Sequence, residues 1–274
     1  MKKNLSTIIL ILVFVTGLSL LLYPTVSDYW NSFHQSQAIA TYASEVAALD
    51  NDDYDELWAA AEAYNQRLAR RGNPLMQSEE DLAEYEALLN IAGSGVMGYI
   101  EIPELKVSLP VYHGVDEGVL QIAVGHIPGT SLPTGGKGTH SVLSGHRGLP
   151  SAKLFTNLDQ MREGDTFMLR ILDETLTYEV DQILIVEPHE VAALSIDPDE
   201  DYCTLVTCTP YGINTHRLLV RGHRVENQAE AQTVRVTADA MQIEPVIVAP
   251  MVAAPMLLCR MLWVLLRNPK KKKR

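Results

Sequence analysis

The sequence predicts a mainly β protein in which seven or eight strands form a closed or nearly closed barrel. Short β-type runs separated by Gly, Pro and Asp fill residues 97–226. Residues 28–71, by contrast, contain no Gly or Pro and are rich in Ala, Glu, Gln and Leu, which indicates helices. A barrel is favoured over an open sheet because closure removes exposed strand edges. We therefore expect a β-barrel with N-terminal helices, flanked by apolar segments at both chain ends.

The predicted barrel segment contains seven clear β-type runs and one short helical run. The helix is expected at 151–158, after Pro150. The candidate strands are 98–102, 107–111, 139–144, 166–172, 176–186, 202–209 and 217–224.

The first 27 residues predict a membrane anchor. No charged residue lies between Lys3 and Asp28, and residues 5–22 are almost entirely apolar, which is long enough to cross a bilayer. A cleaved signal peptide is the alternative, but no small-x-small cleavage site follows cleanly. A retained anchor is the favoured interpretation.

A second, weaker membrane span is predicted at 246–266, after a polar linker at 227–245. The segment is apolar apart from Arg260 but contains Pro250 and Pro255, so a buried or interfacial helix is the alternative. A basic tail at 267–274 follows it, and Lys2 and Lys3 precede the first span. The positive-inside rule then places both termini in the cytoplasm and the barrel outside the cell membrane.

Residues 28–96 are predicted to form a helical region between the anchor and the barrel. Residues 50–53 break it and cap a second helix, which Gly72 and Pro74 end, and residues 78–81 cap a third helix. We expect the first helix to be a stalk that spaces the barrel from the membrane and the second to pack on the barrel.

Net charge and cysteine content argue against a nucleic-acid-binding protein and against a disulfide-stabilised one. The net charge is −12 despite the basic tail, so nucleic acid is not an expected partner. Of three cysteines, Cys259 lies in the second apolar segment, and Cys203 and Cys208 lie five residues apart on one predicted strand. Their side chains then point to opposite faces and cannot form a disulfide. A lone thiol outside the cell more often serves chemistry than structure.

Three residues at strand ends predict a thiol acyl-transfer site. The stretch LVTCTPYGINTHR, residues 205–217, is typical of a hairpin. The hairpin brings Cys208 and Arg217 together at one end of two adjacent strands, and we call this end the mouth. The stretch VLSGHRG, residues 142–148, is a β-type run that ends at His146. Cysteine, histidine and arginine together suit nucleophilic catalysis by a thiol.

Two longer segments, THSVLSGHRGLPSAKLF and DYCTLVTCTPYGINTHRLLVRGHR, resemble sortases, the cysteine transpeptidases of Gram-positive cell surfaces. The resemblance is greatest to the pilin-polymerising class C. It covers residues 97–224, about half the chain, with MGYIEIPELKVSLPVYHG and VGHIPGTSLPTGG in the same order. It implies the eight-stranded sortase barrel.

The resemblance, not spacing, selects His146 among the histidines. A metal site is another interpretation of so many histidines, but no HxxxH or CxxC pair is present. His146 competes with His113, His126, His140, His216 and His223.

The chemistry assigns a role to each of the three candidates. Cys208 is the expected nucleophile, His146 the general acid/base, and Arg217 the residue that stabilises the oxyanion or positions the substrate. Cys203 is expected to be packed on the opposite strand face. Thr207, Thr209 and His140 are candidates for lining the substrate groove.

A lid and a calcium loop are weaker hypotheses. Class C sortases have an Asp-Pro-aromatic lid over the cysteine, and the matching residues here, within 72–78, are Asn73, Pro74 and Leu75. Asn cannot form an ion pair with Arg217 and Leu replaces the aromatic, so both a looser lid and a plain turn remain open. The acidic loop at 187–201 suits calcium, but a solvated loop is favoured and no cofactor is expected.

The resemblance implies a reaction and its partners. The enzyme would cleave an LPXTG-type sorting signal between Thr and Gly through a thioacyl intermediate, and join it to a lysine amine of another pilin subunit. Pilin or surface-protein substrates, the acceptor lysine and membrane lipid are the expected partners. The alternatives are a housekeeping sortase that uses the peptidoglycan precursor, a cysteine peptidase, and a catalytically silent module that binds sorting signals or serves as a pilus scaffold.

Overall fold

The computed structural model describes residues 2–71, 75–91, 93–227, 256 and 260. By its internal contacts the chain divides into two units, Met1–Asp239 and Ala240–Arg274, and the barrel belongs to the first. The predicted 227–245 linker, 246–266 span and 267–274 tail lie outside the described residues, except for Asn227, Met256 and Arg260.

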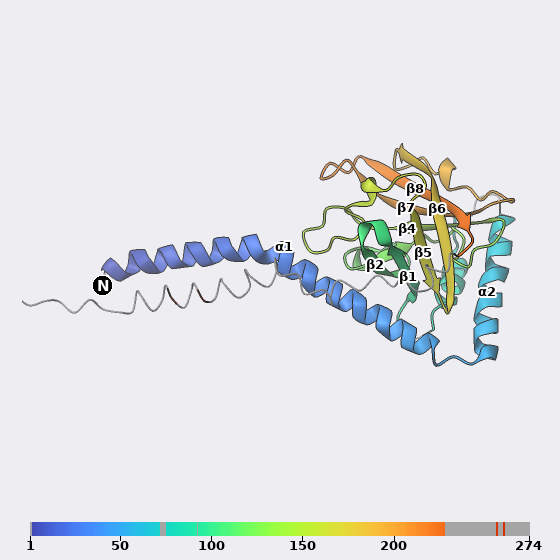
Figure 1. The fold of residues 1–274 in the computed structure, drawn as a ribbon, viewed down its shortest axis with the longest axis horizontal. Coiled ribbons are helices and arrows are strands. Elements are labelled where there is room, and N and C mark those ends of the chain that lie inside the picture. Colours follow the sequence, from blue (N-terminus) through green and yellow to red (C-terminus); the bar gives the residue numbers. More distant parts are fainter. Residues whose placement is uncertain (1, 72–74, 92, 228–255, 257–259, 261–274) are drawn as a thin grey trace, which may run out of the picture. The chain divides into compact units, whose positions relative to one another are not determined.

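Eight strands close into a barrel in the order β1-β2-β3-β4-β7-β8-β6-β5 (Figure 1). Strand β4 runs parallel to β7, β2 runs parallel to β3, and the other neighbours are antiparallel. The strands are β1 (Val96–Ile102), β2 (Val107–His113), β3 (Val124–His126), β4 (Thr139–Ser144), β5 (Thr166–Ile171), β6 (Glu174–Val186), β7 (Asp201–Thr209) and β8 (His216–Val225).

This architecture confirms the predicted mainly β barrel. The sequence predicts seven of the eight strands, and only β3 is missed, because three residues are too few for an alternating pattern. Barrel interior and exterior follow the two-residue period of the strands. On β7, Cys203 and Leu205 point into the main core, whereas Val206 belongs to a second apolar cluster on the outer face.

Within the described part of residues 2–227, four α-helices and three short 3₁₀ turns accompany the barrel. The α-helices are α1 (Lys2–Val46), α2 (Asn51–Ala69), α3 (Glu79–Ala87) and α4 (Glu117–Leu120). The 3₁₀ turns are η1 (Pro103–Leu105), η2 (Leu158–Gln160) and η3 (Ala192–Leu194).

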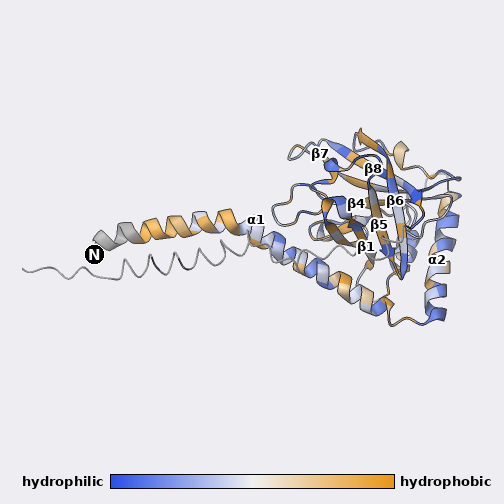
Figure 2. Cartoon of the chain, viewed as in Figure 1, coloured by the Kyte–Doolittle hydropathy of each residue, from blue (hydrophilic) through white to orange (hydrophobic). Residues whose placement is uncertain are grey.

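The N-terminal half of α1 is hydrophobic and its second half is mixed (Figure 2). Among the described helices, α1 is the one that is long and apolar enough to cross a membrane. Its side chains in that apolar part are exposed, including Leu20 and Leu21. The membrane-anchor prediction is therefore consistent with a helix whose apolar surface is not covered by the described part of the chain.

The second half of α1 packs on the barrel, although the sequence predicts a stalk there. Gln35 and Tyr42 are buried. The Tyr42 hydroxyl donates to the Met97 carbonyl at 2.9 Å and accepts from the Leu172 N–H at 2.7 Å. The sequence does not distinguish a solvated polar side chain from one that bonds to a distant backbone. In the structure, Gln35 and Tyr42 bond to backbone atoms of the barrel unit.

Helices α2 and α3 begin where the sequence places their caps. Asp50 caps α2 by accepting from the Asp53 N–H, and Ser78 and Asp81 form a reciprocal capping box on α3. Asn65 of α2 bonds to both the N–H and the carbonyl of Leu132. The prediction that the second helix packs on the barrel is confirmed.

The prediction of a helix at 151–158 is wrong. These residues form turns, with Leu154 in the left-handed region at a φ of 38° and a bridge between Leu149 and Ala152. Tertiary packing overrides the local preference, because Ala152, Leu154 and Phe155 are all buried in the main core.

Candidate active site

The β7–β8 hairpin brings Cys208 and Arg217 together. They are direct partners in the antiparallel register, so their side chains lie on the same face. Leu205, three residues before Cys208, and Leu218, directly after Arg217, belong to the main core. Because strand side chains alternate between the two faces, Cys208 and Arg217 lie on the outer face. The hairpin predicted from the spacing of these two residues is confirmed.

His146 lies on the other side of Cys208. The last paired residues of β4 and β7 are Ser144 and Val206, so the same register continued for two residues sets His146 beside Cys208. Two further bonds hold that alignment: the Gly145 N–H donates to the Val206 carbonyl at 3.0 Å, and the Thr207 hydroxyl donates to the Gly145 carbonyl at 2.7 Å. Cys208 and Arg217 thus pair on β7 and β8, and the continued register extends this row to His146, two residues beyond the end of β4.

Within the described residues, no side-chain hydrogen bond engages the His146 ring or the Cys208 thiol. Both residues are half-buried. The Arg217 guanidinium donates through Nη1 to the carbonyls of Asn214 and His216, at 3.3 and 3.1 Å. These bonds hold the arginine across the turn and, within the described residues, engage only Nη1 of its guanidinium.

Cys203 is a poor nucleophile in this structure. It is fully buried in the barrel interior, where burial raises the pKa of its thiol well above the ordinary value. Neither Cys203 nor Cys208 forms a disulfide, as the sequence predicts. Of the two described thiols, only Cys208 is accessible and lies beside a histidine and an arginine.

The groove candidates do not all lie at this mouth. His140 shares the outer face with His146, but it is buried, with Nδ1 2.9 Å from the Ser195 carbonyl and Nε2 2.7 Å from the Thr204 hydroxyl. Burial lowers the pKa of His140, which favours the neutral ring. The prediction that His140 lines the groove is wrong, because the loop before β7 covers it.

Thr207 and Thr209 are buried on the strand face opposite to Cys208. The Thr207 hydroxyl holds the loop of His146, and the Thr209 hydroxyl accepts from Arg147 Nη1 at 3.3 Å. These threonines therefore support the mouth from behind and do not form its surface.

Sequence reasoning missed Arg147 and Tyr211, which connect the loop of His146 to the β7–β8 turn. Arg147 pairs with Asp159 and lies 5.8 Å from the centre of the exposed Tyr211 ring, although it reads as a solvated arginine in sequence. A Cβ at Gly148, whose φ is +76°, would lie 2.9 Å from that ring. The β7–β8 turn thus touches the loop of His146. The adjacency of Arg147 to His146 was the only sequence signal.

An apolar cluster lies one row below Cys208 on the outer face. Val142, Val206 and Leu219 form its floor, and Ala193 and Leu194 of the β6–β7 loop pack on it. A segment bound beside Cys208 with the loop displaced would find an apolar surface here.

The lid hypothesis falls largely outside the described residues. Asn73 and Pro74 are not described, and Leu75 is half-buried. Ion pairs Arg67–Glu84 and Arg71–Asp81 join α2 to α3 on either side of this segment. A lid role remains a prediction.

Among the described residues, no group of three or more His, Cys, Asp or Glu side chains is arranged to hold a metal ion. In the acidic loop, carboxylates bond to the loop's own backbone, as Glu190 does to the Glu187 N–H and Asp197 to the Asp199 N–H. This local bonding suits the solvated loop that the sequence favours.

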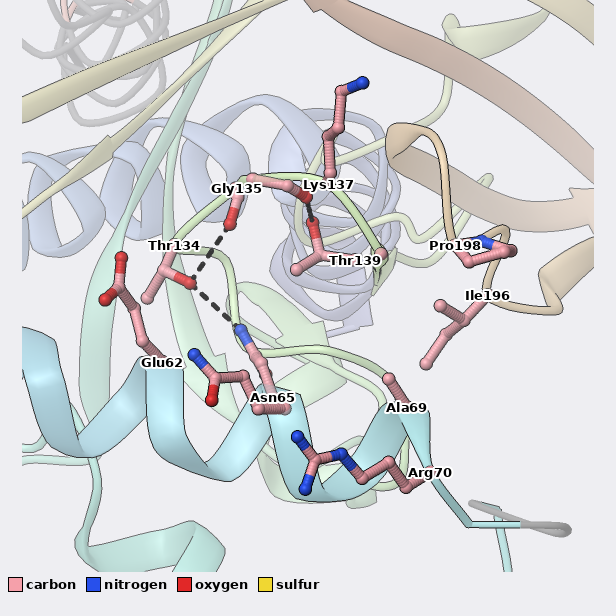
Figure 3. A pocket seen from close by; sticks show the side chains of 13 residues that line it. Glu62, Asn65, Ala69, Arg70, Thr134, Gly135, Lys137, Thr139, Ile196 and Pro198 are labelled. Atoms are coloured by element: carbon pink, nitrogen blue, oxygen red, sulfur yellow. Dashed lines mark hydrogen bonds between the residues drawn. The ribbon is translucent and has the colours of Figure 1, made fainter.

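A cavity of about 470 Å³ lies at the opposite end of β7 (Figure 3). It is lined by α2 residues such as Asn65 and by the glycine-rich loop that contains Lys137. Thr139, on its wall, pairs with Asp201 at the start of β7, so Cys208 lies about 23 Å away at about 3.3 Å per residue. This cavity is therefore separate from the candidate active site.

Comparison with known proteins identifies the family. The family model for the Sortase domain matches residues 100–225. Sortase C1 from Streptococcus agalactiae is 49% identical, with a TM-score of 0.69 over 70% of this chain and 100% of that chain. This chain belongs to the sortase family. Sortase C of Streptococcus pneumoniae is 42% identical, with a TM-score of 0.63, over 70% of this chain and 98% of that one.

Sortases of other classes are also similar. Sortase D of Bacillus subtilis is 26% identical over 152 residues, which are 54% of this chain and 74% of that protein. The structural neighbours named above are class C, so the sortase barrel and its class C likeness are both established. The row of His146, Cys208 and Arg217 lies within the region matched by the sortase domain.

Proposed function

We propose that this sortase is a membrane-anchored cysteine transpeptidase that polymerises pilins. It cleaves an LPXTG-type sorting signal between Thr and Gly and joins the Thr carbonyl to a lysine amine of another pilin subunit. The observation that carries the proposal is the row formed by Cys208 and Arg217, which pair on β7 and β8, and by His146, two residues beyond the end of β4. The 49% identity to a sortase C1 over that protein's whole chain supports the class.

The proposed chemistry uses each residue of the row. The Cys208 thiolate attacks the Thr carbonyl, and Arg217 donates hydrogen bonds to the resulting oxyanion. As the C–N bond breaks, His146 gives a proton to the leaving Gly amine and a thioester remains. The lysine amine then attacks the thioester, His146 takes its proton, and the Cys208 thiolate leaves as the isopeptide bond forms.

The apolar cluster beside Cys208 supports a peptide substrate with an apolar residue before the cleaved bond. Val206 lies two residues before Cys208 on β7, so the two side chains share the outer face. A sortase C of Clostridium perfringens has been solved with its C-terminal cell wall sorting motif, and this chain is 42% identical to it over 70% of its own length. We infer that the leucine of an LPXTG-type signal packs on this cluster.

The membrane topology is part of the proposal. Helix α1 anchors the chain in the membrane, and the predicted 246–266 segment crosses it a second time. By the positive-inside rule both termini, with the basic tail, lie in the cytoplasm and the barrel lies outside the cell. An extracellular barrel meets surface proteins directly. Attachment of single proteins to the peptidoglycan precursor is the second candidate, because sortases D and A are also among the relatives.

The test uses the full-length protein in nanodiscs with a fluorescent LPXTG-type peptide and a lysine-bearing pilin domain. Mass spectrometry should find a peptide joined to the pilin lysine, and Cys208→Ala should give none. Cleavage without joining, followed by transfer to a peptidoglycan-type amine, would favour the second candidate. Absence of both cleavage and thioester at Cys208 in a folded protein would refute the transpeptidase.

A further inference from the structure

The end of the barrel that carries Cys208 is bonded directly to the helix that would leave the membrane. Asp28 of α1 accepts from the Lys153 N–H at 2.9 Å, and Asn31 donates to the Ser151 carbonyl at 2.8 Å. Gln35 donates to the Ile122 carbonyl at 2.6 Å. Three bonds from two turns of one helix therefore fix its direction relative to this end of the barrel.

The bonded loop is the one that follows His146. Its residues 149–156 fold back so that the Phe155 N–H donates to the His146 carbonyl at 3.1 Å. Ile122 precedes β3, and β3 pairs with the end of β4 at Gly125 and Ser144. These three bonds of α1 thus reach the loop that follows His146 and the residue before β3, whereas Tyr42, farther along the helix, bonds to Met97 and Leu172; Figure 1 shows the second half of α1 running along the barrel.

The depth of these contacts follows from helix geometry. Residues 4–27 carry no charge and, at a rise of about 1.5 Å per residue, extend about 36 Å, slightly more than a hydrocarbon core of about 30 Å. Asp28, the first charged residue, therefore lies at the level of the lipid headgroups. Asn31 lies less than one turn of about 5.4 Å farther out.

The side chains at this level suit an interface. Tyr29, Trp30 and Phe33 are exposed on α1, and Ile122 is exposed on the barrel. Trp30 and Ile122 line one cavity of about 270 Å³ between α1 and β2. Exposed Trp and Tyr directly after an apolar span are the side chains that settle at a membrane surface.

We propose that Tyr29, Trp30, Phe33 and Ile122 form a docking strip that rests in the lipid headgroup layer. The bonds from Asp28, Asn31 and Gln35 then hold the Cys208 end of the barrel at the membrane surface. The occupant is the bilayer, because the strip begins one residue after Asp28, where the uncharged part of α1 ends. The net charge of −12 favours a neutral lipid surface over an anionic one.

This inference extends the proposed function by placing its site at headgroup depth, but its test uses no catalysis. The full-length chain is placed in phosphatidylcholine vesicles that contain phosphatidylcholine with a nitroxide on the headgroup. The three tryptophans, Trp30, Trp58 and Trp263, are replaced by Phe. One reporter tryptophan is then introduced by Ile122→Trp, and a matched control by Lys137→Trp at the cavity on the opposite end of β7.

We expect the nitroxide to quench the reporter at 122 at least about twofold more strongly than the control at 137. Equal quenching at both positions would overturn the proposal, whatever the enzyme does. If Ile122→Trp does not fold, the reporter moves to Val115→Trp, which is exposed and lies beside Gly125 of β3, three residues from Ile122. In that case stronger quenching at 115 than at 137 supports docking, and equal quenching again overturns it.

Discussion

The two ends of the outer face of β4, β7 and β8 carry similar residues with different fates. At one end, His146, Cys208 and Arg217 stand in a row, and neither the ring nor the thiol has a hydrogen-bond partner among the described residues. At the other end, both ring nitrogens of His140 are bonded, and Arg221 forms a bidentate pair with Asp181.

The difference lies in what surrounds each set. Arg221 also stacks on Tyr202, with its guanidinium 4.1 Å from the ring centre, and the Ser195 carbonyl from the β6–β7 loop covers His140. Fully bonded polar groups stabilise a fold, whereas accessible groups without partners remain available for chemistry. Residue type and strand face alone do not separate a structural histidine or arginine from a reactive one.

The largest expected effect comes from the two cysteines. Cys208→Ala should reduce transpeptidation at least about a thousandfold, because the nucleophile is lost. Cys203→Ala should keep the activity but lower the free energy of unfolding by about 1 to 2 kcal/mol, because it leaves a small cavity in the core. Peptide cleavage and urea denaturation measure the two effects. Activity that survives Cys208→Ala but not Cys203→Ala would reverse the assignment.

The histidines give the next comparison. His146→Gln should lower the rate about 100- to 10,000-fold by removing the acid/base group, with little change in unfolding. His140→Gln should lower the free energy of unfolding by about 1 to 3 kcal/mol, because buried partners lose their bonds. Single-turnover rates and urea midpoints for both variants provide the check. An equal loss of stability in both would remove the distinction between the two ends.

The arginines should differ in the same way, with a smaller catalytic effect. Arg217→Gln should reduce kcat about 100- to 1,000-fold if its N–H groups stabilise the oxyanion. Arg221→Gln should leave kcat near that of the wild type and cost about 1 to 2 kcal/mol of stability, since Asp181 loses its partner. Comparing kcat with KM for the peptide separates the two. An unchanged kcat in Arg217→Gln would argue for a positioning role only.

The smallest expected effect is a pH dependence of stability from a buried histidine that the site does not use. Burial lowers the pKa of His126 to about 4, and its Nε2 lies 2.8 Å from the Ser131 carbonyl. Between about pH 6.5 and pH 4 the unfolded chain binds a proton there that the folded chain does not. The free energy of unfolding should therefore fall as pH falls through this window, by up to about 3 kcal/mol.

Urea denaturation of the wild type and of His126→Gln at pH 7.5 and pH 4.5 measures this effect. The variant should be less stable than the wild type at pH 7.5, but its stability should depend less on pH. Equal slopes for both proteins would exclude His126 as a source of the acid sensitivity.

Several features followed from local sequence. The cap residues Asp50 and Ser78, seven of the eight strands and the Cys208–Arg217 hairpin each depend on residues close together in the chain. The opposite faces of Cys203 and Cys208 followed from the two-residue period of a strand. The family resemblance then selected His146, which spacing alone did not.

The predictions that failed depended on distant partners. Residues 151–158 were expected to be helical, but Leu154 and Phe155 are drawn into the barrel core as turns. The second half of α1 was expected to be a free stalk, yet its Tyr42 bonds to Leu172, 130 residues away. His140 was expected at the groove, and a carbonyl 55 residues later covers it.

The sequence by itself determined the apolar N-terminal helix, the strand pattern and the identity of a cysteine, a histidine and an arginine at or near strand ends. These are properties of short segments, set by side-chain periodicity, turn residues and hydropathy. Only the tertiary structure decided that β4 lies beside β7, which sets His146 in one row with Cys208 and Arg217. It also decided which polar groups are bonded and buried, because burial depends on loops and helices far away in the chain.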